Sequence, residues 1–129
     1  MVGIVIVSHS KNIAEGIKEL SMQMAPEAKV ATAGGTKDNR IGTDMEKITE
    51  CIKEVYSEDG VLVLFDLGSA YMNAEMAIEF LDEELRGKVI IADTAIVEGG
   101  LTAIVEASMG RNLQEIKDSV EVMKLNKMP

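Results

Sequence analysis

The chain has 129 residues and a mass of 13.9 kDa, the usual size of one domain. Hydrophobic residues make up 47% and charged residues 27%, a globular mixture that excludes intrinsic disorder. The net charge of −9 excludes a cationic stripe for nucleic acid and argues against binding to an anionic membrane surface. We therefore expect a single domain over residues 1–129, with no nucleic acid and no membrane among its partners.

The compartment follows from three further absences. No apolar run approaches the roughly 18 residues that a membrane-spanning helix needs. The first residues lack the basic region of a signal peptide and lead directly into core-like sequence. The single cysteine, Cys51, excludes an internal disulfide and fits a reducing compartment. We expect a cytoplasmic protein in which Cys51 fills space beside a helical stripe and is no nucleophile.

The first half of the chain alternates between strand and helix patterns. Residues 3–7 form a β-branched run that is apolar on both faces, typical of a covered strand. Helical spacing follows until Pro26 stops it, and residues 29–33 form a second strand. A polar loop over residues 34–43 precedes a helix that begins at Asp44. The stripes expected to face the core are Ile13, Ile17, Leu20 and Met24 in the first helix and Met45, Ile48, Ile52 and Val55 in the second.

The second half repeats the alternation. Residues 61–65 are the most apolar strand, and Ser69 stands where a third helix opens. Residues 88–92 form a fourth strand, after which two helices are separated by Gly110. The expected core stripes of these helices are Tyr71, Ala74, Ile78 and Leu81; then Leu101, Ile104 and Val105; then Leu113, Ile116, Val120 and Met123.

Alternating strands and helices with short connections predict an α/β fold in which a parallel sheet lies between two helical layers. Right-handed crossovers leave only a few doubly wound orders. We predict the order 2-1-3-4, with the first and third strands adjacent. In such sheets the site lies beyond the carboxyl ends of the strands, where the order reverses.

The carboxyl ends of the first and third predicted strands carry the chemistry. His9, the only histidine, follows the first strand, and Asp66 follows the third. Imidazole is a nucleophile at neutral pH and then a good leaving group, provided that its other nitrogen is held by an acceptor such as Asp66. A histidine taken alone after a strand is more often an ordinary surface residue. Asp66 on the same edge favours the interpretation that His9 is catalytic.

Glycine and hydroxyl residues on the same edge predict a site for an anion. Gly35-Thr36 after the second strand and Gly68-Ser69 after the third could bring backbone amides close to a phosphate, the latter at a helix N-terminus. The alternative is that the glycines only make turns and that Ser69 is only a helix cap. Neither a Walker sequence nor a GxGxxG motif is present, and one histidine with one cysteine is too few for a metal site.

Four segments together resemble a known family. They are residues 5–10, 33–36, 41–44 and 65–75, of which the last, joined to Ser8-His9-Ser10, is the specific one. They resemble the phosphotransferase subunits of phosphoenolpyruvate-dependent dihydroxyacetone kinases, which belong with the mannose-type enzyme IIA domains of the bacterial sugar phosphotransferase system. The resemblance extends over essentially the whole chain.

The resemblance implies a phosphoryl carrier without cofactor or metal. His9 would accept a phosphoryl group from the histidine-containing phosphocarrier protein and pass it to ADP on the kinase subunit, while a third, dihydroxyacetone-binding subunit takes part indirectly. Asp66 matches the acid that hydrogen-bonds the active histidine, and Gly35, Thr36, Gly68 and Ser69 match loops around the phosphoryl site. Family members form homodimers. Some also carry fused carrier domains, so a chain ending at residue 129 is expected to use separate donor proteins.

Two departures separate this chain from the hexose-transporting members. They have a glycine after the histidine and Gly-Gly-Ser-Pro after the aspartate, whereas this chain has Ser10 and Gly68-Ser69-Ala70. The dihydroxyacetone branch is therefore favoured. The alternatives are a IIA component for a sugar permease and a non-catalytic flavodoxin-like domain that binds an anion or a partner. An acidic cluster after the first strand, as in receiver domains, is absent, and aromatic residues for a flavin make up only 3%.

Overall fold

A computed structural model describes all 129 residues and contains one four-stranded sheet. All strand pairs are parallel, and the order is β2-β1-β3-β4, which confirms the predicted order. The central position of β1 and β3 makes their ends neighbours, with Val7 opposite Phe65. The strands are β1 (Gly3–Ser8), β2 (Val30–Gly34), β3 (Val61–Phe65) and β4 (Val89–Ala92).

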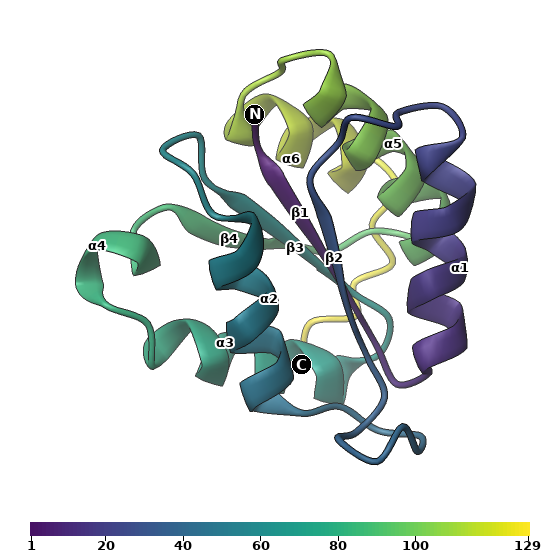
Figure 1. Ribbon diagram of the computed structural model, residues 1–129, viewed down its shortest axis with the longest axis vertical. Helices are drawn as coiled ribbons and strands as arrows, with labels where there is room; N and C mark the ends of the chain where they lie inside the picture. The colour runs from purple at the N-terminus through teal and green to yellow at the C-terminus, as the bar shows by residue number, and fades with distance from the viewer.

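Helices cover both faces of the sheet, so the predicted three-layer α/β class is confirmed (Figure 1). One face carries α1, α5 and α6, and the other carries α2 and α3. A short helix, α4, lies beyond α3. None of these helices is both long and apolar enough to cross a membrane. Their bounds are α1 (Lys11–Met22), α2 (Met45–Val55), α3 (Gly68–Glu79), α4 (Glu83–Arg86), α5 (Ile96–Ser108) and α6 (Leu113–Glu121).

The strands divide their side chains between two cores. Because successive residues of a strand point to opposite faces, Ile4 and Ile6 pack under α1, α5 and α6, whereas Val5 and Val7 pack under α2 and α3. All four are fully buried. The doubly apolar sequence of β1 is thus explained by a helical layer on each side of it.

The predicted core stripe of α1 is wrong at three of its four positions. Ile13, Leu20 and Met24 are 48%, 49% and 65% exposed, and only Ile17 is buried. The helix instead turns Ala14 and Ile17 inward. Small residues let the backbones approach closely here, since a Cβ placed on Gly34 of β2 would stand 2.9 Å from the Cβ of Ala14.

The same preference for small residues governs α3. Its buried positions are Ala70, Ala74 and Ala77, whereas Tyr71 and Ile78 from the predicted stripe are only partly buried against the core. The stripes of α2 and α6 agree better with prediction, since Ile48, Ile52, Val55, Ile116 and Val120 are all buried. Close helix packing, more than hydrophobic size, decides which face turns inward in α1 and α3.

Candidate functional site

The carboxyl ends of β1 and β3 bring the two predicted chemical residues together. Asp66 Oδ1 lies 2.9 Å from Nδ1 of His9, and Asp66 Oδ2 accepts a hydrogen bond from the His9 backbone amide at 2.9 Å. The ring and the carboxylate therefore meet in a fixed orientation. Their side chains are 20% and 14% exposed, which leaves the imidazole reachable from solvent.

The second ring nitrogen faces α3. The hydroxyl oxygen of Ser69 lies 2.7 Å from Nε2 of His9. Because an ionised carboxylate only accepts hydrogen bonds, Nδ1 carries the ring proton in this arrangement and Nε2 is left with its lone pair. Ser69 then donates to Nε2, the ring nitrogen that Asp66 does not hold.

Four donors converge on the carboxylate of Asp66. Besides the two from His9, the Ser8 hydroxyl donates to Oδ2 at 2.9 Å and the Leu67 amide to Oδ1 at 2.7 Å. Burial raises the pKa of Asp66, but these hydrogen bonds outweigh burial, so its pKa lies below the ordinary value. Asp66 consequently stays ionised at neutral pH and can hold a proton-bearing Nδ1.

Ser8 is a site residue that the sequence analysis does not select. Its side chain is fully buried; besides donating to Asp66, its hydroxyl accepts the amide of Ser10 at 3.1 Å. A buried hydroxyl at the end of an otherwise apolar strand is the signal that could have marked it, because such a group needs hydrogen-bond partners.

The start of α3 offers unpaired backbone donors beside the ring. The N-cap of the helix is Leu67, which makes no side-chain hydrogen bond to the helix. Ser69 is therefore not the helix cap, and that alternative interpretation is wrong. The amides of Gly68 and Ser69 donate to no acceptor within the protein. Unpaired amides at a helix N-terminus favour an anion, and here they lie next to the Ser69 hydroxyl and Nε2.

The other predicted anion loop is arranged differently. The amide of Gly35 donates to the Ser8 carbonyl at 3.0 Å, and that of Thr36 donates to the Arg40 carbonyl at 2.9 Å. Neither amide is therefore free for a phosphate. The loop instead returns to His9, whose carbonyl accepts the amide of Gly42 at 2.8 Å. This loop therefore helps to hold the backbone of His9, while the Thr36 hydroxyl accepts the amide of Arg40 at 3.1 Å.

Other chemistries find no support in the side chains. No group of three or more histidine, cysteine, aspartate or glutamate residues could hold a metal ion. Burial, followed by the charge of Glu54, raises the pKa of Cys51 to about 11, and its thiol donates to the Thr32 carbonyl at 3.5 Å. A thiol with that pKa is protonated at neutral pH and does not act as a nucleophile.

A doubly wound sheet with one oriented imidazole at its edge defines a class of phosphoryl-transfer domain, and a family model for that class matches this sequence. The family model described as "PTS system fructose IIA component", of the mannose-type enzyme IIA domains, matches residues 3–117. The chain belongs to this family, and within it to the branch of the phosphoryl donor subunits of phosphoenolpyruvate-dependent dihydroxyacetone kinases.

Curated relatives support the branch. The phosphoryl donor subunit DhaM of Escherichia coli is 43% identical over 120 residues, which are 90% of this chain but 25% of that protein. The chain therefore spans about a quarter of that longer relative. Relatives of similar length are a DhaM subunit of Listeria innocua, 37% identical with 94% of it covered, and the phosphotransferase subunit of Lactococcus lactis, 37% identical with 98% covered.

Solved structures share the fold. A crystal structure of a protein of unknown function superposes over 100% of both chains with a TM-score of 0.85 and 30% identity. A sigma-54 interaction domain protein from Enterococcus faecalis matches 94% of this chain and 88% of its own, with a TM-score of 0.69 at 20% identity. The second likeness concerns the fold alone.

Proposed function

We propose that this chain is the phosphoryl carrier of a phosphoenolpyruvate-dependent dihydroxyacetone kinase. His9 takes a phosphoryl group from the histidine-containing phosphocarrier protein and passes it to ADP on the kinase subunit. The ATP regenerated in this way then phosphorylates the dihydroxyacetone held on the third subunit, so this chain acts on that subunit only indirectly. The observation that carries the proposal is the imidazole of His9, held at Nδ1 by Asp66 and turned with Nε2 toward Ser69 and the start of α3.

The first transfer needs no proton movement at Nε2. The Ser69 hydroxyl turns from Nε2 to a phosphoryl oxygen, which frees the lone pair of Nε2. This lone pair attacks the phosphorus of the donor phosphohistidine, the new N–P bond forms, and the donor N–P bond breaks with its electron pair returning to the donor imidazole. The ring of His9 gains positive charge as the bond forms, and the Asp66 carboxylate at 2.9 Å from Nδ1 stabilises that charge. The amides of Gly68 and Ser69 and the hydroxyls of Ser69 and Thr36 are the proposed donors to the phosphoryl oxygens.

The second transfer reverses the same chemistry. A terminal phosphate oxygen of ADP attacks the phosphorus on His9, and the N–P bond breaks with its electrons returning to Nε2. Positioning and charge stabilisation account for most of the catalysis in such a transfer. The partly exposed ring of His9 leaves room for a partner to bring its own reactive group.

Mass spectrometry tests this proposal. The protein is incubated with phosphoenolpyruvate, enzyme I and the phosphocarrier, and one acid-labile adduct on His9 is expected. Addition of the ADP-loaded kinase subunit should remove the adduct, whereas addition of a sugar permease should not. An unlabelled chain would reject the carrier function, and discharge only to the permease would assign the chain to the sugar-transporting branch.

Loss of the Ser69 hydroxyl should slow the transfer. In Ser69→Ala we expect the rate of phosphoryl acceptance, measured by quench flow, to fall about tenfold, because one donor to the phosphoryl oxygens is lost. The neighbouring hydroxyl of Ser10 serves as the control, since it caps α1 by accepting the Ile13 amide. Ser10→Ala should lower stability by about 1 kcal/mol and leave the rate near that of the wild type. Equal rates in Ser69→Ala and the wild type would remove Ser69 from the site.

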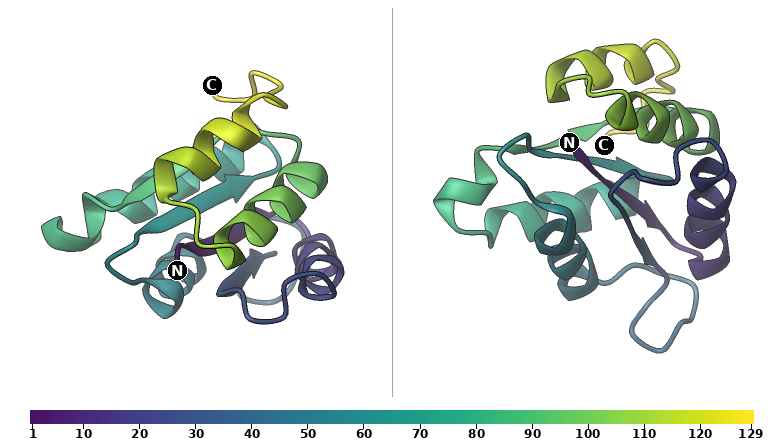
Figure 2. Two further views of the ribbon diagram at one scale, coloured as in Figure 1. Left: turned by 90° about the horizontal axis from the view of Figure 1, so that it is seen from above. Right: turned by 45° about the horizontal axis from the view of Figure 1, so that its top comes forward.

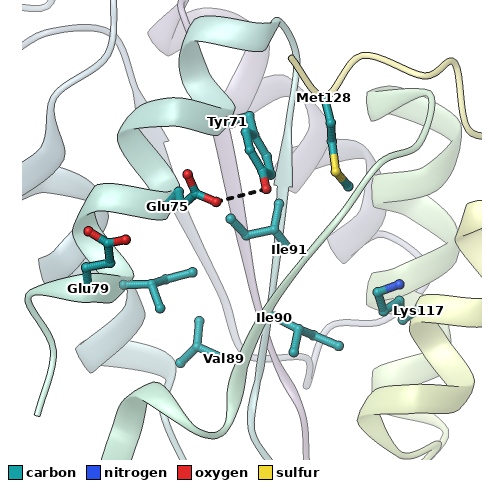
Figure 3. A pocket seen from close by; sticks show the side chains of 9 residues that line it. Tyr71, Glu75, Glu79, Val89, Ile90, Ile91, Lys117 and Met128 are labelled. Atoms are coloured by element: carbon teal, nitrogen blue, oxygen red, sulfur yellow. Dashed lines mark hydrogen bonds between the residues drawn. The ribbon is translucent and has the colours of Figure 1, made fainter. Parts of the chain in front are cut away.

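We also propose that the chain is a homodimer in the cytoplasm. The outer edge of β4 pairs with no strand, and a groove of about 370 Å³ runs beside it between α3 and α6, lined by Ile90, Ile91 and Tyr71 among others (Figure 3). An unpaired edge beside apolar side chains favours a second copy at this position. The rest of the lining is Glu75, Ile78, Glu79, Val89, Lys117 and Met128.

Sedimentation tests the dimer and its position. The protein should sediment at twice the mass of the 13.9 kDa chain, and Ile91→Lys should sediment as a monomer because a charge would then be buried at the interface. Met109→Lys, at an exposed position at the end of α5, is the matched control and should remain dimeric. A dimer that persists in Ile91→Lys would place the interface elsewhere.

A further inference from the structure

The segment after α6 crosses the carboxyl ends of β4 and β3. It runs from residue 122 to residue 129, past β4 and β3 toward the first turn of α3 (Figures 1 and 2). Its anchor is Asp93, which is 4% exposed and accepts the amides of Leu125 at 3.3 Å and Lys127 at 2.8 Å. The Ala95 amide adds a bond to the Met123 carbonyl at 3.1 Å. A buried carboxylate paired with two amides holds this segment in one place.

Within this segment, Lys127 contacts the last residue of β3, next to the candidate site. Its ammonium donates to the carbonyl of Phe65 at 2.9 Å and stands 4.9 Å from the centre of the Phe65 ring. Phe65 is the last residue of β3 and directly precedes Asp66. No carboxylate lies within salt-bridge distance of this ammonium. The cation is therefore held by a backbone carbonyl and an aromatic face, two contacts that fix its place.

The same residue touches the beginning of α3. A Cβ on Gly68 would stand 3.3 Å from the carbonyl oxygen of Lys127, so the segment packs directly on the first residue of the helix. This end of α3 lacks a side-chain cap at Leu67. Lys127 thus contacts Phe65 and Gly68. These two residues directly precede Asp66 and Ser69, the two groups that meet the ring of His9.

The charge of Lys127 is consistent with this location. Burial lowers the pKa of Lys127, whereas the charges of Asp93 and Asp66 oppose that shift. Asp93 and Asp66 thus both favour the charged form of Lys127, although neither carboxylate forms a salt bridge with it.

We propose that Lys127 is a positioning residue of the phosphoryl site. By holding the Phe65 carbonyl and the start of α3, it sets Asp66 and Ser69 against the two ring nitrogens of His9. This inference rests on the proposed phosphoryl transfer, because small misplacements of an orienting group slow transfer strongly. The effect of Lys127 on the orientation of the His9 ring can be measured in the isolated protein, without any partner.

Three variants test the inference. Lys127→Met keeps an apolar stem against Phe65 but removes the donor, and Lys127→Arg keeps a donor and a charge. Lys124→Met is the matched control, because Lys124 lies in the same segment, is exposed and makes no side-chain contact by hydrogen bond or salt bridge. Each variant is compared with the wild type by the proton resonance of His9 Nδ1–H in the isolated protein, and by kcat and KM for phosphoryl acceptance.

Lys127→Met should move the Nδ1–H resonance upfield and lower kcat about tenfold, with KM for the phosphocarrier unchanged, since the ring is less well oriented but still accessible. Lys127→Arg should restore both readouts, and Lys124→Met should match the wild type. Resonance and kcat in Lys127→Met equal to those in Lys124→Met would overturn the inference.

A fourth variant separates the role of Lys127 from a folding defect. Asp93→Ala releases the segment from its anchor without altering Lys127, and it should move the same resonance in the same direction while circular dichroism reports a folded protein. An unmoved resonance in this variant also overturns the inference. If the wild-type protein accepts no phosphoryl group at all, the proposed function fails, and the resonance comparison still decides the position of Lys127.

Discussion

Replacing His9 by alanine should leave a folded protein that takes up no acid-labile phosphoryl group. The chain has one histidine, so this variant removes the only imidazole at the meeting point of β1, β3 and α3. The imidazole contributes little to the core, because the buried contacts at this edge come from Phe65 and Val7. Labelling from phosphoenolpyruvate in the presence of enzyme I and the phosphocarrier should fall below detection, as measured by mass spectrometry at neutral pH.

Two controls make this result interpretable. Circular dichroism should give the same melting temperature for His9→Ala and the wild type within a few degrees, since the amide of residue 9 still donates to Asp66. His9→Gln should be equally inactive, because an amide cannot carry a labile phosphoryl group. Retention of acid-labile label in either variant would assign the phosphoryl group to another residue and refute the proposed chemistry.

The second large effect is expected in Asp66→Ala. Without the carboxylate the ring proton is no longer fixed on Nδ1, and the positive charge that forms during transfer is not stabilised. We expect the rate of phosphoryl acceptance to fall on the order of 100-fold, with KM for the phosphocarrier little changed. Rapid-quench kinetics measures the rate. An unchanged rate would show that Asp66 does not orient the ring.

Asp66 should also make stability depend on pH. The pKa of Asp66 is lower in the folded protein than in the unfolded chain, so ionised Asp66 stabilises the fold above the unfolded value of about 4. That contribution is lost as the pH falls through the lower folded pKa. The free energies of unfolding of the wild type and Asp66→Asn, measured by urea titration between pH 3 and pH 7, should therefore become more alike as the pH falls. A constant difference in free energy of unfolding between the two proteins across this pH range would mean that Asp66 does not cause the pH dependence.

Much of the fold was predictable from local pattern. Five-residue runs of valine, isoleucine and leucine have few other uses in a domain of this size than a covered strand, and β3 has the bounds expected from its sequence, residues 61–65. The handedness of crossovers then restricted the order of the strands. Because the order 2-1-3-4 makes β1 and β3 neighbours, it predicts that His9 and Asp66 meet although they are 57 positions apart in the chain.

The helix faces were less predictable. Hydrophobic spacing favours the larger side chain, so Leu20 and Met24 were expected in the core, whereas Ala14 and Ser21 occupy it. The distance between two backbones decides that choice, and spacing along one helix carries no information about the partner it meets. The close approach of Gly34 to α1 is the counterpart that selects Ala14.

The sequence by itself determined the sheet, the edge that carries the site, and the pair His9 and Asp66, because these follow from periodicity and from the types of residue at strand ends. Only the tertiary structure decided three features: the contact of Ser69 with Nε2, the pairing of the Gly35 and Thr36 amides with backbone carbonyls, and the bond from Lys127 to the Phe65 carbonyl. The bonds made by Ser69, Gly35 and Lys127 join segments distant in the chain, and such a bond forms only where the fold brings donor and acceptor atoms within about 3 Å of each other.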